Sequence, residues 1–294
     1  MGRQGGRVVA AVALVVAVVA GCGGPGQAGA AVIVGDEVVP VEVVQARLDD
    51  ALSRPGLQDE LAAQGVGAPD LAREIVAGLV LRELLERAAA TAGVTVTDDD
   101  VDREVDANGG VEALLAAAPY DETVLREIVR NQLISVRLGE RRAAELGAVD
   151  ADVVVTQSRE EAEAAAQALL AGGPAADALF GGQNSRRGAT VPVVAETAAW
   201  PLFGVPVGSA VVFQPSQDQA GWWAALVTGV RGPEGDAEPV PETALASLGR
   251  QAARPVAAEV GLRVNPRYGR WDPVTLGVVP DGFDTGRIFA PAAE

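Results

Sequence analysis

The stretch PDLAREIVAGLVLRELLERAAATAGVTVTDDDV, residues 69–101, decides the fold of the first half of this chain. Apolar residues recur in it every three or four positions, which is the spacing of one face of a helix, while most charged residues fall on the other face. The pattern predicts a long amphipathic helix from Pro69 to about Ala92. Its apolar stripe consists of Leu71, Ile75, Val76, Leu79, Val80 and Leu84.

A second helix is predicted at the end of the same stretch. Thr97 is a typical helix-capping residue, and Asp98–Asp100 occupy the first turn, where free N–H groups and the helix dipole favour acids. We interpret this acidic run, and Glu160–Glu163 further on, as solvated helix starts and not as a calcium site. Residues 31–148 are therefore expected to form a mainly helical domain. Its other helices are predicted at about 41–53, 111–117 and 121–146.

The periodicity changes at Val149, where short runs of β-branched and aromatic residues replace the helical pattern. Residues 149–232 are expected to form a small α+β domain, in which Ser158 caps a helix. A linker rich in Pro, Gly and acidic residues is predicted at 233–241. The expected strands lie at 153–155, 191–194, 210–213 and 222–230.

The C-terminal segment 242–275 is expected to return to the first domain and pack on it. It contains a predicted helix at 242–260, interrupted at Pro255, and a short strand that begins at Val264. This strand needs a partner, and Ala31–Val34 is the nearest strand without one. Residues 276–294 have no clear pattern, and we expect a disordered tail there.

The N-terminus has the features of an exported lipoprotein. Two arginines precede a run of Val, Ala and Leu from Val8 to Ala20, which is too short to cross a bilayer but suits a secretory signal. The run ends in Val19-Ala20-Gly21-Cys22, which resembles the bacterial lipobox. We predict a signal peptide at 1–21, a lipid on Cys22, a flexible tether at 22–30, and a location on the extracytoplasmic face of the cell membrane. The alternative is a plain signal peptide with an incidental cysteine.

The composition excludes several classes of site. The 294 residues include no histidine and one cysteine, which excludes Ser-His-Asp and Cys-His catalysis and His-ligated zinc. No GxxxxGK[ST] motif is present and no GxGxxG motif opens a helix, so no nucleotide is expected. The net charge of −17 becomes −19 when residues 1–21, with two arginines and no acid, are removed, and such a surface repels nucleic acid. We predict no cofactor, no metal and no nucleic-acid partner.

Four motifs of the first domain resemble the SurA- and PrsA-like envelope chaperones, whose N-terminal domain is also similar to part of trigger factor. Ala31–Val41 (AVIVGDEVVPV) looks like the family's first strand and helix start. Ile75–Leu85 (IVAGLVLRELL) and Val94–Val101 (VTVTDDDV) are similar to its following helices, and Val124–Ile134 to its long helix. The resemblance implies a mainly helical SurA/trigger-factor-like chaperone domain. The alternative is an unrelated helical domain with the same generic signals.

Residues 151–232 resemble a shortened parvulin-type prolyl isomerase domain. Val205–Ser209 (VPVGS) looks like the turn before a strand, and Gly221–Val227 (GWWAALV) looks like that family's final strand. The histidines of the family's site are absent, and tryptophan or alanine stands in the last strand. We therefore carry over no catalytic residue and predict a degenerate parvulin-like domain. Residual peptidyl-prolyl cis-trans isomerase activity is the one enzymatic alternative.

The resemblance implies an α+β protein that acts as an ATP-independent chaperone or foldase for unfolded, newly exported polypeptides. The alternative is a structural or adaptor lipoprotein with one defined protein partner. Aromatic residues of the second domain are candidates for peptide binding, but core packing is the competing interpretation and is favoured for at least half of them. The two tryptophans that are neighbours in one predicted strand would point to opposite faces of the sheet. The candidate peptide-binding residues are Trp200, Phe203, Phe213, Trp222 and Trp223.

Overall fold

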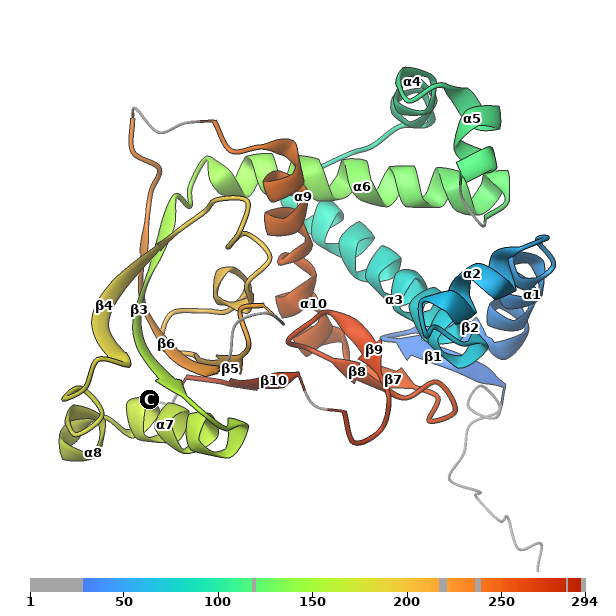
Figure 1. The fold of residues 1–294 in the computed structure, drawn as a ribbon. Helices are drawn as coiled ribbons and strands as arrows, with labels where there is room; N and C mark the ends of the chain where they lie inside the picture. Colours follow the sequence, from blue (N-terminus) through green and yellow to red (C-terminus); the bar gives the residue numbers. More distant parts are fainter. Residues whose placement is uncertain (1–28, 118–119, 217–220, 236–238, 284, 292–294) are drawn as a thin grey trace, which may run out of the picture.

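The chain folds into helices and three small β-sheets, so the predicted α+β class is confirmed (Figure 1). The predicted signal peptide and Cys22 lie outside the described residues, as does most of the predicted tether. The computed structural model describes residues 29–117, 120–216, 221–235, 239–283 and 285–291.

One part of the molecule, which we call the helical lobe, contains α1 (Val41–Leu52), α2 (Leu57–Ala63), α3 (Ala68–Ala92), α4 (Asp98–Ala107), α5 (Gly110–Ala117) and α6 (Glu122–Ala143). The apolar stripe of α3 lies in its core, where Val76, Val80 and Leu84 are fully buried. Thr97 caps α4 as predicted, because its hydroxyl accepts a hydrogen bond from the backbone N–H of Asp100. Helices α4 and α5 lie on one side of α6 and α3 on the other (Figure 1).

A three-stranded sheet packs on α3 and joins segments that are far apart in the sequence. Its central strand is β1 (Ala30–Val34), which lies between β2 (Glu37–Pro40) and β7 (Leu262–Val264). The strands are antiparallel, and Val32 lies opposite Val264. The predicted pairing between the first strand and the C-terminal strand is confirmed.

The rest of the chain forms the sheet lobe, built on β3 (Ala148–Thr156), β4 (Ser185–Pro192), β5 (Ala210–Phe213), β6 (Trp222–Arg231) and β10 (Gly286–Phe289). These strands form one antiparallel sheet in the order β10-β5-β6-β3-β4. Helix α7 (Arg159–Ala171), which Ser158 caps as predicted, covers one face, and the short α8 (Gly173–Asp177) follows it. The other face packs on the 3-10 turn η1 (Pro201–Gly204) and on α9 (Glu242–Arg250).

The C-terminal residues correct one prediction, because the described part of 276–294 is not a disordered tail. β9 (Gly277–Val279) pairs with β8 (Arg270–Asp272), and β10 pairs with β5. Ile288 and Phe289 of β10 pack on opposite faces of the sheet. A strand of this length has too few residues to show the alternation of apolar and polar side chains that predicts a strand. It forms because it pairs with β5, which is distant in sequence.

Helix α9 crosses α6 and so connects the two lobes (Figure 1). The contact is backbone to backbone. A Cβ at Gly139 would overlap the carbonyl group of Leu245, and a Cβ at Gly249 would overlap that of Ser135. The helix of this segment is divided into α9 and α10 (Ala253–Val260), with the break before Pro255 and not at it, and α10 packs against the core of the helical lobe.

Candidate functional site

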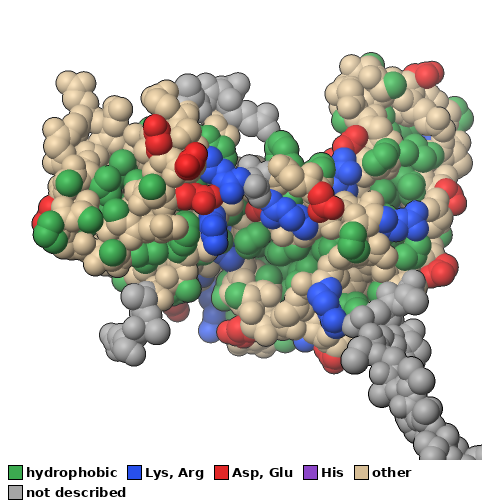
Figure 2. All heavy atoms as spheres, turned by 90° about the horizontal axis from the view of Figure 1, so that it is seen from below, with side chains coloured by type: hydrophobic (Ala, Val, Ile, Leu, Met, Phe, Trp, Pro, Cys, Tyr) green, Lys and Arg blue, Asp and Glu red, His purple; other side chains and the backbone are tan. Residues whose placement is uncertain are grey.

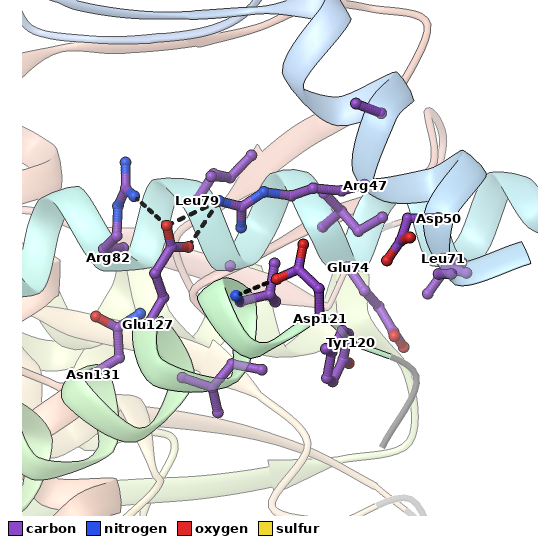
Figure 3. A pocket seen from close by; sticks show the side chains of 16 residues that line it. Arg47, Asp50, Leu71, Glu74, Leu79, Arg82, Tyr120, Asp121, Glu127 and Asn131 are labelled. Atoms are coloured by element: carbon purple, nitrogen blue, oxygen red, sulfur yellow. Dashed lines mark hydrogen bonds and ion pairs between the residues drawn. The ribbon is translucent and has the colours of Figure 1, made fainter. Parts of the chain in front are cut away.

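A cleft opens in the helical lobe between α1, α3 and α6 (Figure 3). It has a volume of about 360 Å³, and its walls combine aliphatic and charged side chains. Ile128 is 43% exposed although it is a large apolar residue, so the cleft presents apolar surface to solvent. The aliphatic side chains come from α3 and α6 and are those of Leu71, Ile75, Leu79, Val124 and Ile128.

Small residues keep this cleft open. Gly78 of α3 lines it, and a Cβ added there would meet no atom within 4 Å. Ala46 of α1 also lines it and is exposed. A glycine inside a helix costs about 1 kcal/mol relative to alanine. Gly78 is not needed for a turn or for a close contact with another backbone. Its effect on the structure is the space that its missing side chain leaves in the cleft.

One end of the cleft holds a carboxylate between two arginines. Glu127 of α6 accepts a hydrogen bond from Arg47 of α1 at 2.8 Å and another from Arg82 of α3 at 3.2 Å (Figure 3). The three side chains are between 23% and 28% exposed. Because the two ion pairs connect three helices, they help to fix the width of the cleft.

The other end of the cleft is acidic. Asp50 of α1, Glu74 of α3 and Asp121 lie around Tyr120 there (Figure 3). Asp121 caps α6 by accepting a hydrogen bond from the backbone N–H of Val124 at 2.8 Å, whereas no described arginine pairs with Asp50 or Glu74. Burial, together with the negative charge of Glu74, raises the pKa of Tyr120. The phenol is therefore neutral at neutral pH and can donate a hydrogen bond.

These groups are those of a binding site. The cleft can bury apolar side chains and can pair with charged ones at its two ends. In the part of the chain that the structure describes, no group of three or more His, Cys, Asp or Glu side chains is placed to hold a metal ion. The helices of that part are also all too short or too polar to span a bilayer.

The five aromatic residues predicted to bind peptide lie in the sheet lobe, and the structure separates them. Phe203 and Phe213 are in its core, with 0% and 2% exposure, so they offer no binding surface. Trp200 and Trp223 pack against the same core and are partly exposed. Trp222 points to the opposite face, against α7, as the alternation along a strand predicts.

Trp200, Phe213 and Trp223 form an aromatic cluster. The ring centroid of Trp200 lies 5.7 Å from that of Phe213 and 5.3 Å from that of Trp223, in tilted and edge-on arrangements typical of packed rings. The two tryptophans also line a second hollow of about 470 Å³ on the sheet, beside Val153 and Val155. Since each ring is already packed against the others, only their outer edges face this hollow.

None of the cleft residues is among the predicted site residues. The sequence contains one signal for the cleft, because Gly78 stands inside a long predicted helix, where glycine is unfavourable without a structural or functional reason. The charged residues of α1 and α6 give no such signal. Which faces of three helices meet is decided by packing, and this cannot be read from the pattern of one helix.

Figure 2 shows that hydrophobic side chains form patches over both lobes on one face of the molecule, with arginine and acidic side chains next to one another between the patches. The ion pairs of the helical lobe likewise join neighbouring side chains of opposite charge, such as Arg126 with Asp102 and Arg87 with Asp36. Most arginines are therefore neutralised locally, and the excess of acids sets the overall charge.

The N-terminal part of the chain is similar to a known protein family. Residues 4–146 match the family model of the SurA-like N-terminal domain, a range that includes α1 to α6 and the whole cleft. This match confirms the predicted resemblance to SurA- and PrsA-like chaperones and supports a general chaperone role. No curated protein matches the sequence.

Two solved structures are similar over most of their length. The foldase protein PrsA from Lactococcus lactis has 14% identity and a TM-score of 0.29, and the match covers 80% of this chain and 94% of that one. A structure described with the SurA-like chaperones PEB4 and Cj1289 of Campylobacter jejuni has 11% identity and a TM-score of 0.26, with 81% and 99% covered. At TM-scores this low, the likeness carries no argument about function.

Proposed function

We propose that this chain is an extracytoplasmic chaperone that binds unfolded exported polypeptides in the cleft between α1, α3 and α6. The match of residues 4–146 to the SurA-like N-terminal domain supports this proposal. The observation that carries the proposal is the apolar cleft that Gly78 leaves open. Binding is independent of ATP, because the sequence contains no phosphate-binding loop.

The cleft suits weak binding that tolerates many sequences. Burial of apolar surface contributes about 25 cal/mol per Å², from which the cost of ordering the client is subtracted. A volume of about 360 Å³ has room for a few side chains of an extended segment and none for a folded domain. Its aliphatic walls make few directional contacts, so different apolar side chains can occupy it.

The proposal includes a lipid anchor on Cys22, which would keep the cleft near the site where exported chains emerge. It rests on the short apolar run before the Val19-Ala20-Gly21-Cys22 box. The wild-type chain is expected in the membrane fraction of an expressing cell, and Cys22→Ser in the soluble extracytoplasmic fraction. An unchanged distribution of the variant would argue against the anchor and leave the chaperone proposal in place.

The chaperone proposal is tested by light scattering from an aggregating unfolded client, with residues 22–294 added at increasing ratios. Suppression is expected near stoichiometric amounts. Gly78→Leu, which adds a side chain where a Cβ would meet no atom within 4 Å, is expected to raise the amount needed about tenfold. Gly181→Leu is the matched control, because a Cβ at Gly181 also meets no atom within 4 Å but lies in the sheet lobe.

Absence of suppression at every ratio would contradict the proposal. Recovery of one stoichiometric envelope protein, with no binding to unfolded chains, would favour the adaptor alternative. A proline-peptide assay tests the isomerase alternative, and catalysis above the uncatalysed rate would assign activity to the degenerate parvulin-like domain.

A further inference from the structure

We infer that the cleft selects client segments in which an apolar side chain has a basic neighbour. This inference rests on the proposed function and names the class of segment that the same site prefers. It is argued from the charges around the cleft, from their placement at its two ends, and from the apolar walls between them.

The charges that line the cleft are unequal in number. Arg47 and Arg82 are its basic side chains, and both are paired with Glu127. A client carboxylate would therefore have to displace an ion pair that is already formed. An arginine or lysine of the client meets no such competition at the acidic end. At that end, the side chains of Asp50 and Glu74 have no partner among the described residues, and Asp121 accepts one hydrogen bond as the cap of α6.

The three acids converge from three different helices. Asp50 lies on α1, Glu74 on α3 and Asp121 at the start of α6, and they surround the same end of the cleft beside Tyr120 (Figure 3). Their negative charges are complementary to a cation carried on a client side chain. A lysine or arginine can lay its apolar stem along the cleft wall and extend its charged head to these acids.

The apolar and acidic parts adjoin each other within one cleft. Leu71 and Ile75 of α3 lie within one helical turn of Glu74 and line the same space. A client residue that fills the space beside Gly78 thus places its immediate neighbours near the acidic end. The preferred segment is an apolar residue with arginine or lysine next to it.

The test is fluorescence anisotropy with two labelled peptides, Gly-Arg-Leu-Phe-Leu-Arg-Gly and Gly-Glu-Leu-Phe-Leu-Glu-Gly. The full chain is held in phosphatidylcholine nanodiscs, and empty nanodiscs are the blank. The basic peptide is expected to bind about tenfold more tightly at low salt, since exposed ion pairs are weak individually and two or more act together. The difference should shrink at high salt.

The overall negative charge also attracts the basic peptide, so a matched pair of variants separates the two effects. Asp50→Asn combined with Glu74→Gln is expected to reduce the preference to about twofold. Glu160→Gln combined with Glu234→Gln removes the same charge from exposed positions of the sheet lobe and its linker, and is expected to leave the preference unchanged. Gly78→Leu should weaken the binding of both peptides.

Equal affinity for the two peptides, or an equal effect of both pairs of variants, would overturn the inference while the chaperone proposal stands. Binding of neither peptide, together with no suppression of aggregation, would overturn both. A preference that persists in Gly78→Leu would place the recognition outside the cleft and would also overturn the inference.

Discussion

The helical lobe and the sheet lobe each have a hollow lined by apolar residues, and the two hollows are built in opposite ways. In the sheet lobe, large rings such as Trp200 and Trp223 meet one another and close the surface. In the helical lobe, small residues such as Gly78 and Ala46 leave the space between aliphatic side chains unfilled. The five aromatic residues of the sheet lobe therefore serve mainly in packing, because Phe203 and Phe213 are buried and the tryptophans pack against the cores on the two faces of the sheet.

The largest effect is expected where the lobes meet. Gly139→Leu would force α6 and α9 apart, since even a Cβ overlaps the carbonyl group of Leu245. We expect a loss of about 3 kcal/mol or more in the free energy of unfolding. The measurement is urea denaturation followed by circular dichroism.

The matched control for this variant is Gly78→Ala, another glycine in a long helix but one with open space around it. This control is expected to raise the free energy of unfolding by about 1 kcal/mol. Equal destabilisation by both variants would show that neither the close crossing nor the open cleft is as described.

Trp223→Ala tests the contrast between the hollows directly. Removal of a partly buried ring from the aromatic cluster is expected to lower the free energy of unfolding by about 2 kcal/mol, somewhat less than for a fully buried aromatic residue. Suppression of client aggregation at a temperature where the variant stays folded should be unchanged. Loss of suppression in a folded variant would move the site to the sheet lobe.

Glu127→Gln is expected to have a smaller effect of about 1 kcal/mol, because the pairs with Arg47 and Arg82 are partly exposed and screened by salt. The Glu127→Gln variant should also change which of the two peptides binds more tightly. Two freed arginines should raise the affinity for the acidic peptide and reduce the preference for the basic one. A variant that binds only more weakly, with the same preference, would contradict the role assigned to this carboxylate.

The smallest effect concerns the attachment of α4 to α6 and depends on pH. Hydrogen bonds from Arg137 and from the backbone N–H of Thr97 lower the pKa of Asp100 below its usual value of 3.8. A lowered pKa means that the charged carboxylate stabilises the folded state above the unfolded pKa, and that this contribution is lost as the pH falls toward the folded pKa.

Hydrogen exchange of the α4 amides is expected to stay slow from neutral pH down to about pH 4 and, after correction for intrinsic rates, to become faster below it. In the Asp100→Asn variant, the α4 amides should exchange faster at neutral pH, and most of the dependence of their exchange rate on pH should disappear. An identical pH profile in this variant would assign the effect to another group.

Much of the fold follows from local pattern. The stripe of α3, the cap at Thr97 and the strand that needed a partner are all visible in the sequence, because each depends on neighbours a few residues away or on one unsatisfied edge. The proposed domain boundaries remain predictions.

The features that the sequence does not reveal depend on contacts between distant segments. β10 pairs with the edge of β5, and the cleft is formed where α1, α3 and α6 meet. The burial of Phe203 under the sheet likewise needs α9, which lies beyond the linker. None of these contacts has a periodic signature in its own segment.

The pairing of Val32 with Val264 has a consequence for the timing of folding. A chain that crosses a membrane N-terminus first delivers β1 about 230 residues before β7 arrives. During that interval one edge of β1 is open, which is the kind of edge that recruits other chains. The helical lobe, although it is encoded first, is thus completed only when β7 arrives, and the sheet lobe is completed later still, when β10 pairs with β5.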